Sequence, residues 1–109
     1  MEAHYIVVLI TAPSSDVGRQ IANVLLEQKL AACVNIISLI NSLYLWEGKI
    51  NDDQEALLLV KSRAELFEHR LVPAVKAIHP YKVPEIIALP ILIGAKPYLD
   101  WIEEETRCE

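Results

Sequence analysis

The chain contains 109 residues, of which 10 are Lys or Arg and 15 are Asp or Glu, so its formal net charge is −5 at pH 7. This length suits a single domain, residues 1–109, and a negative charge without a basic stripe argues against a nucleic-acid partner. No apolar run approaches the roughly 20 residues of a membrane-spanning helix. The 2 cysteines form neither a disulfide framework nor a CxxC motif, so we expect a cytoplasmic protein without a membrane partner.

Apolar residues make up 53% of the chain, and the mean hydropathy is +0.29. That content is high for so small a protein, because small domains have a large surface relative to their volume. The surplus predicts that part of the apolar surface is covered by another subunit.

The first third of the chain predicts a strand, a helix and a second strand. The unbroken apolar run 5–10 is typical of a central strand buried on both faces. Ser14 or Ser15 can cap the following helix, which should fade by Lys29. Its apolar stripe consists of Val17, Ile21, Val24 and Leu25. The run 30–37 then predicts a second buried strand.

A long hairpin is predicted next, with its tip at residues 47–49. Leu43 and Leu45 alternate with Tyr44 and Trp46, and residues 54–61 resume as a third strand. The irregular stretches 38–41 and 51–53 predict bulges or bends along the hairpin.

The remaining elements are a second helix, a fourth strand and a short final helix. Apolar spacing predicts a helix over 67–78, with a kink at Pro73 because proline removes the bond to the His69 carbonyl. Residues 86–93 predict a strand that Pro90 restricts to an edge or a bulge. Pro97 opens the last helix. The order predicts an α+β, ferredoxin-like β-α-β-β-α-β sandwich with a long hairpin between its second and third strands and a short C-terminal helix.

Residues 79–85, the proline-bounded segment, combine a rigid backbone with an imidazole, a phenol, an amine and a carboxylate. Pro80 and Pro84 force the chain to run extended, so the preceding helix must stop near Ile78. One interpretation is a functional site. The other is a helix stop whose Tyr81 fills the core and whose charges are solvated.

Lys61 ends an apolar strand and should lie close to the rim of the core, where a lysine normally pairs with a carboxylate. Glu85 is the partner we expect, although an anion-binding role for Lys61 is equally open. Trp46 and Tyr44 can stack on a ligand or cover a sheet face or subunit contact.

The histidines His4, His69 and His79 are scattered, and no two have the spacing that places metal ligands on one helical face. A tight tetrahedral site within one chain is therefore not predicted. No nucleophile–base pair or acid–base dyad is legible, so we expect a protein that is not an enzyme.

Four ordered motifs resemble the CutA divalent-cation-tolerance family over nearly the whole chain. They are residues 30–35, residues 42–50, residues 79–81 with Pro84 and Glu85, and residues 98–101. The resemblance implies a ferredoxin-like subunit in a homotrimer whose long hairpins extend sheets between neighbours. It also implies a cytoplasmic protein associated with tolerance of copper and other divalent metals.

Only His79 carries over from the copper pattern of the family, because Ile10 and Ile78 stand where some members have a cysteine and a second histidine. We therefore expect weak binding of copper or another divalent cation at His79, with no required cofactor. Similar trimers include the PII signalling proteins, which bind nucleotides in intersubunit clefts. They imply an alternative, a small-molecule sensor that uses Trp46, Lys61, Tyr81 and Glu85, and a non-catalytic trimeric scaffold is a further alternative.

Overall fold

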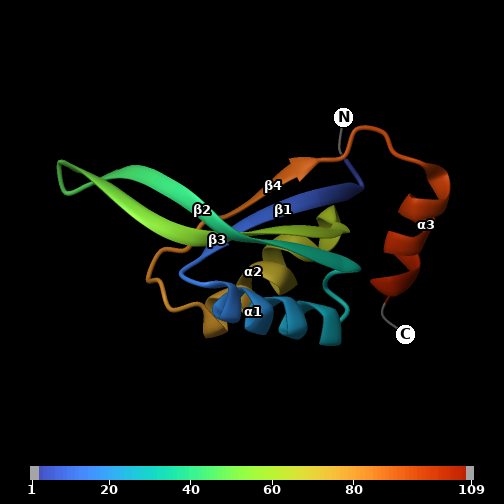
Figure 1. Ribbon diagram of the computed structural model, residues 1–109. Helices are drawn as coiled ribbons and strands as arrows, with labels where there is room; N and C mark the ends of the chain where they lie inside the picture. Colours follow the sequence, from blue (N-terminus) through green and yellow to red (C-terminus); the bar gives the residue numbers. More distant parts are fainter. Residues whose placement is uncertain (1–2, 108–109) are drawn as a thin grey trace.

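The computed structural model describes residues 3–107, and it confirms the α+β, ferredoxin-like prediction. The sheet is antiparallel with strand order β2-β3-β1-β4, and α1 and α2 lie side by side against one face of it (Figure 1). A further helix, α3, lies at one end of the sheet, opposite the end from which the hairpin projects. The elements are β1 (Tyr5–Ala12), α1 (Ser15–Glu27), β2 (Cys33–Trp46), β3 (Lys49–Arg63), α2 (Val72–Ile78), β4 (Ile86–Pro90) and α3 (Lys96–Glu105).

Helix α1 begins where its sequence predicts. The Ser14 hydroxyl oxygen accepts a 3.2 Å hydrogen bond from the Val17 amide, which satisfies one of the free N–H groups of the first turn. A Cβ atom on Gly18 would lie 3.1 Å from Leu58, so the glycine lets the helix approach β3 closely. The helix ends at Glu27, and Lys29 follows with φ of 58°.

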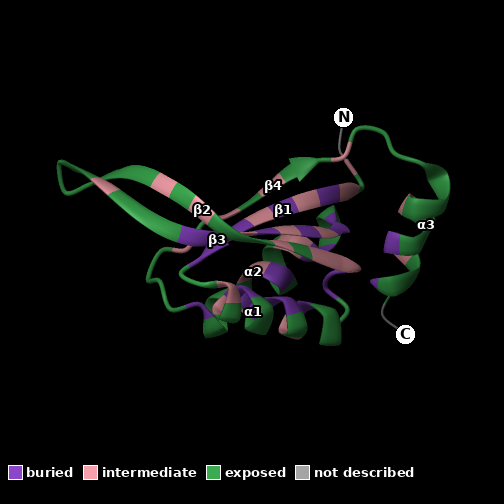
Figure 2. Cartoon of the chain, in the orientation of Figure 1, coloured by how far each residue is buried: buried purple, intermediate pink, exposed green. Residues whose placement is uncertain are grey.

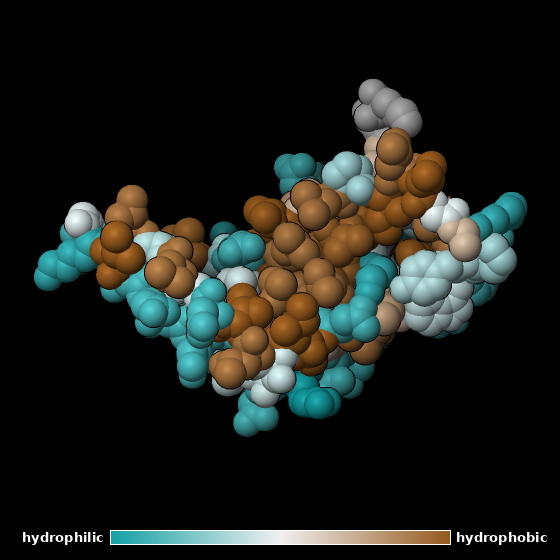
Figure 3. Space-filling view, turned by 45° about the horizontal axis from the view of Figure 1, so that its top comes forward, coloured by the Kyte–Doolittle hydropathy of each residue, from teal (hydrophilic) through white to brown (hydrophobic). Residues whose placement is uncertain are grey.

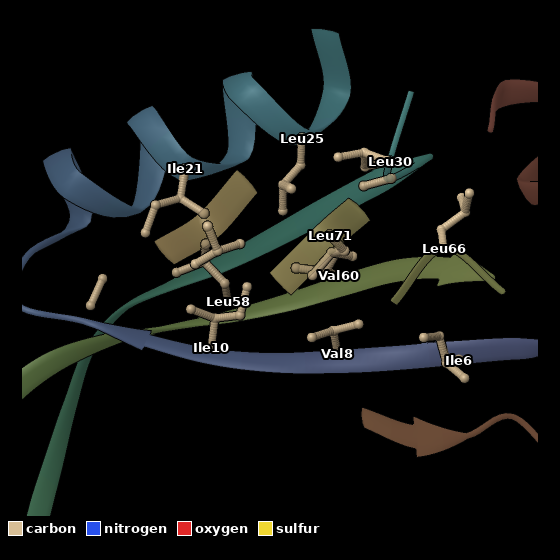
Figure 4. Packing of buried hydrophobic residues seen from close by; sticks show 13 residues of the cluster. Ile6, Val8, Ile10, Ile21, Leu25, Leu30, Leu58, Val60, Leu66 and Leu71 are labelled. Carbon is tan, nitrogen blue, oxygen red and sulfur yellow. The ribbon is translucent and has the colours of Figure 1, made fainter. Parts of the chain in front are cut away.

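The core lies between the sheet and the helices. Ile21 and Leu25 of α1 point toward Leu58 of β3 and toward Val8 and Ile10 of β1 (Figure 4). These side chains are essentially fully buried, so each contributes close to the full hydrophobic stabilisation that burying such a side chain provides.

The opposite face of the sheet, here called the open face, has no helix over it among residues 3–107 (Figure 1). Burial alternates along β1, so the prediction that this strand is buried on both faces is wrong for the single chain. The same correction applies to the predicted second strand, because β2 is an edge strand with many exposed residues. The half-buried or exposed apolar residues of the open face are Val7, Leu9, Leu57, Leu59, Ile87 and Leu89.

Strands β2 and β3 form the predicted long hairpin. Its two-residue turn, Glu47 and Gly48, has φ values of 53° and 78°, the left-handed geometry of a tight hairpin turn. A register shift between Ile37 and Ile40 confirms the first predicted bulge. The second predicted bulge is wrong, because β3 pairs without interruption through residues 51–53.

The outer half of the hairpin projects beyond the rest of the sheet. The pairing of β1 with β3 ends at Ala12 and Ala56, while β3 continues with β2 out to Lys49. This projecting part is almost entirely exposed (Figure 2).

The predicted kinked helix over 67–78 is broken into different helical types. Residues Ala64–Leu66 form a 3₁₀ turn, Phe67–Leu71 form a π-helical turn, and only Val72–Ile78 are α-helical. Pro73 has no N–H to donate to the His69 carbonyl, and the wider turn instead joins the Val72 amide to the Phe67 carbonyl.

Proline also limits β4. In the described part of the chain the strand pairs only with β1, so Pro90 lies on an edge strand as predicted. The strand ends at Pro90 rather than at residue 93. Pro97 lies in the first turn of α3, whose Ile102 is fully buried.

Candidate functional site

The proline-bounded segment is fastened to the fold at His79. This side chain is 7% exposed, and its Nε2 lies 2.8 Å from the main-chain oxygen of Thr11 in β1. Its Nδ1 lies 3.1 Å from the Tyr81 amide nitrogen. A carbonyl only accepts and an amide only donates, so Nε2 carries the proton and Nδ1 is the acceptor.

This geometry bears directly on the metal ligand that the sequence predicts. Both ring nitrogens of His79 are already in hydrogen bonds, so a metal ion would have to displace either Thr11 or the Tyr81 amide. Among residues 3–107, no group of three or more His, Cys, Asp or Glu side chains is placed to hold a metal ion.

Tyr81 joins the segment to the base of the projecting hairpin. Its hydroxyl donates a 2.7 Å hydrogen bond to Oε2 of Glu55, a carboxylate that is 9% exposed. Burial and then the hydrogen bond to the Glu55 carboxylate raise the pKa of Tyr81. Tyr81 therefore anchors the segment and does not fill the core, because the residue is 37% exposed.

A second tyrosine–carboxylate pair lies next to the first. Tyr44 donates to Asp53 within the hairpin, and that hydrogen bond raises the pKa of Tyr44. The Asp53 charge also raises the pKa of Tyr81, so the two pairs are close enough to interact. Asp53 and Glu55 were not predicted from the sequence, although Glu55 was recognisable as the acidic residue at the start of an apolar strand.

Lys61 and Glu85 are not paired, so the predicted ion pair is wrong. Lys61 donates to the side-chain oxygen of Asn35, whereas Glu85 is exposed ahead of β4. In the sheet, Lys61 lies opposite Val7 of β1, and Val7 lies opposite Leu89 of β4. Leu89 is near the end of β4 that is farther from Glu85.

The four residues that the sequence predicts for a small-molecule site do not converge within one chain. Trp46 pairs with Lys49 next to the hairpin turn and is 61% exposed. Lys61 lies near the opposite end of β3, opposite Cys33. Tyr81 donates to Glu55, and within residues 3–107 no hydrogen bond joins it to the other three predicted residues.

The surface also has an extensive apolar area. The open face presents a continuous hydrophobic area in the centre of the molecule, with further apolar side chains along the hairpin (Figure 3). The projecting part of the hairpin exposes Leu39, Leu43, Leu45, Trp46 and Ile50, each at 61% or more. Surface of this extent is typical of an interface.

In the part of the chain that the structure describes, no helix is long and apolar enough to cross a membrane.

Comparison with known proteins identifies the family. The model of the CutA1 divalent ion tolerance protein family matches residues 6–105. The divalent-cation tolerance protein CutA of Thermus thermophilus is 55% identical over 100 residues, which cover 92% of this chain and 96% of that protein. The chloroplastic protein CutA of Arabidopsis thaliana is 49% identical over 94% of this chain, which spans only 56% of the plant protein.

Solved structures agree. The structure described as the periplasmic divalent cation tolerance protein CutA from Archaeoglobus fulgidus superimposes with a TM-score of 0.91 at 47% identity, covering 94% of this chain and 99% of that one. These names describe divalent-cation tolerance and do not describe an enzyme. The chain therefore belongs to the CutA1 divalent ion tolerance protein family.

Proposed function

We propose that this protein contributes to divalent-cation tolerance as a homotrimer, in a binding rather than a catalytic role. The observation that supports the trimer is the apolar open face, which leaves a whole side of the sheet without a covering layer. A sheet packed on one face only leaves its second face to be covered by another subunit when that face is apolar.

The projecting hairpin supplies the reach that such an assembly needs. It extends past β1 and carries apolar side chains on a long unpaired β2 edge. Unpaired edges pair readily with another chain, and permanent interfaces are large and mostly apolar.

Light scattering on the purified protein tests this assembly. We expect about 37 kDa, three times the 12.3 kDa chain mass, at low micromolar concentration. Ile87→Asp places a charge on the open face and should reduce the mass or the solubility. Leu26→Asp is the matched control, because Leu26 is similarly exposed but lies on α1. A stable wild-type monomer would contradict the proposal.

We further propose that His79 binds divalent copper weakly. One imidazole supplies one ligand, while durable copper or zinc sites use three or four. Binding must also displace a hydrogen bond of His79, which lowers the affinity further. Copper should be preferred to zinc by the general affinity order.

Calorimetry with copper tests the metal proposal, and His69→Ala is the control because His69 is exposed on the π-helical turn. We expect dissociation constants on the order of micromolar or weaker for wild type, loss of binding in His79→Ala and no change in His69→Ala. Nanomolar binding that survives His79→Ala would exclude this residue as the ligand.

The location of the protein and the two alternative functions are further parts of the proposal. A cytoplasmic location is proposed from the free Cys33 and the absence of a CxxC motif, although similar proteins are named chloroplastic and periplasmic. The small-molecule sensor requires Trp46, Lys61, Tyr81 and Glu85 to meet across neighbouring chains. The scaffold alternative predicts a trimer with no response to copper.

A further inference from the structure

A groove of about 260 Å³ separates α2 from the last residues of the proline-bounded segment and the start of β4. It lies beside the helix layer and shares no lining residue with the apolar open face. Its walls are Val72 and Lys76 from α2, and Lys82, Val83, Pro84 and Ile86 from the segment and β4.

The groove is positively charged in a protein that is negatively charged overall. Lys76 and Lys82 line it from opposite walls, and no carboxylate is among its lining residues. Within residues 3–107, neither lysine is in an ion pair or a side-chain hydrogen bond. Both ammonium groups are therefore available to an anion, and two together favour a doubly charged one.

One wall of the groove is preorganised. Pro80 and Pro84 restrict the backbone on either side of Lys82, and the His79 and Tyr81 hydrogen bonds fasten the segment to β1 and β3. A ligand would not have to order this wall on binding, which reduces the entropy that binding costs.

The rest of the lining is apolar. Val72, Pro84 and Ile86 supply half-buried aliphatic surface, and Val83 is 78% exposed at the rim. A volume just below the roughly 300–1,000 Å³ of sites for drug-sized ligands suits a small ligand with a compact apolar body.

We propose that this groove binds a small organic anion of the phosphate monoester class. The phosphate lies between Lys76 and Lys82, and the apolar body packs against Val72 and Val83. The site accounts for the exposure of Lys82 and Val83 in the proline-bounded segment, while the hydrogen bonds of His79 and Tyr81 hold the segment in place. This proposal does not depend on metal binding or on the trimer.

Titration of the full-length protein with phenyl phosphate, followed by amide and methyl NMR shifts, tests the proposal. We expect saturable shifts centred on Val72, Val83 and Ile86, with a millimolar or lower dissociation constant. Benzoate has the ring with one charge, and inorganic phosphate has the charge without the ring. Each should bind at least about tenfold more weakly than phenyl phosphate.

Lys76→Met and Lys82→Met should each weaken phenyl phosphate binding about tenfold or more. Arg19→Met is the matched control, because Arg19 is an exposed cation on α1 outside the groove. It should leave the affinity unchanged, and Lys82→Arg should retain binding because it keeps the charge.

The exposed positions of Lys76 and Lys82 predict folded variants, which circular dichroism verifies. Equal affinity in wild type and both lysine variants overturns the proposal. So does phenyl phosphate binding no tighter than benzoate, shifts centred outside the groove, or no saturation at about 10 mM.

Discussion

The His79 ring and the Thr11 carbonyl, 68 positions apart in the chain, are joined by a 2.8 Å hydrogen bond from Nε2. This contact links the end of α2 to the end of β1 and leaves Nδ1 to accept from the Tyr81 amide. The same imidazole therefore fixes the position of the proline-bounded segment and is the metal ligand that we propose.

His79→Ala should destabilise the protein by about 2–4 kcal/mol. The change leaves the buried Thr11 carbonyl and the Tyr81 amide without partners and opens a cavity. Urea denaturation at fixed protein concentration measures the loss, and the exposed His69→Ala should change stability by no more than about 0.5 kcal/mol. Equal effects of the two substitutions would show that the ring of His79 has no structural role.

Tyr81→Phe should cost about 1–3 kcal/mol, because it removes the donor that satisfies the buried Glu55 carboxylate. Tyr44→Phe is the comparison, since Tyr44 bonds to the exposed Asp53 and should lose much less stability than Tyr81→Phe. Chemical denaturation of both variants separates a buried pair from a solvated one. A larger loss of stability in Tyr44→Phe would show that the Tyr44–Asp53 pair, and not the Tyr81–Glu55 pair, is the buried one.

Local patterns in the sequence predicted the elements well wherever a side chain dictates the backbone. Ser14 caps α1, Gly48 occupies a left-handed turn position, and Pro90 lies on an edge strand. Each outcome follows from the chemistry of one residue, so no information about distant contacts is needed.

Burial was harder to predict, because an apolar run does not reveal what covers it. The runs that form β1 and β2 have one face against α1 and α2 and the other on the open face. An apolar face that another subunit covers looks the same in the sequence as one covered by the chain itself.

The partner of Lys61 could have been predicted from the hairpin turn. Trp46 pairs with Lys49, and each step back along β2 matches one step forward along β3. With one extra residue of β2 counted at the bulge, Lys61 lies opposite Cys33 and close to Asn35. The partner of Tyr81 was not predictable in this way, because the contact with Glu55 depends on the path of a segment outside the sheet.

Glu103 on α3 should contribute to an acid-dependent loss of stability. The hydrogen bond to His4 and the nearby Arg63 guanidinium lower the pKa of Glu103 below its usual value of 4.5. The native state therefore holds fewer protons at this site than the unfolded state does. Its stabilisation is present above the unfolded pKa and is lost as the pH falls through the native value.

Glu103→Gln should consequently flatten the decline in stability below about pH 4.5. Glu104→Gln is the control, because Glu104 is exposed and its ion pair is with Arg107 on the surface. Urea denaturation from pH 3 to pH 7 gives both profiles. An unchanged acid slope in Glu103→Gln would mean that this carboxylate does not couple α3 to the sheet.

Lys61 and Glu85 should behave as independent residues, because the structure gives them no shared contact. Lys61→Met and Glu85→Gln should therefore have additive effects on the free energy of unfolding, within about 0.5 kcal/mol. Lys61→Met combined with Asn35→Ala should instead show coupling of about 1 kcal/mol, since those two side chains are hydrogen bonded. Double-mutant cycles by urea denaturation measure both quantities. Strong coupling to Glu85 with none to Asn35 would restore the ion pair that the sequence suggested.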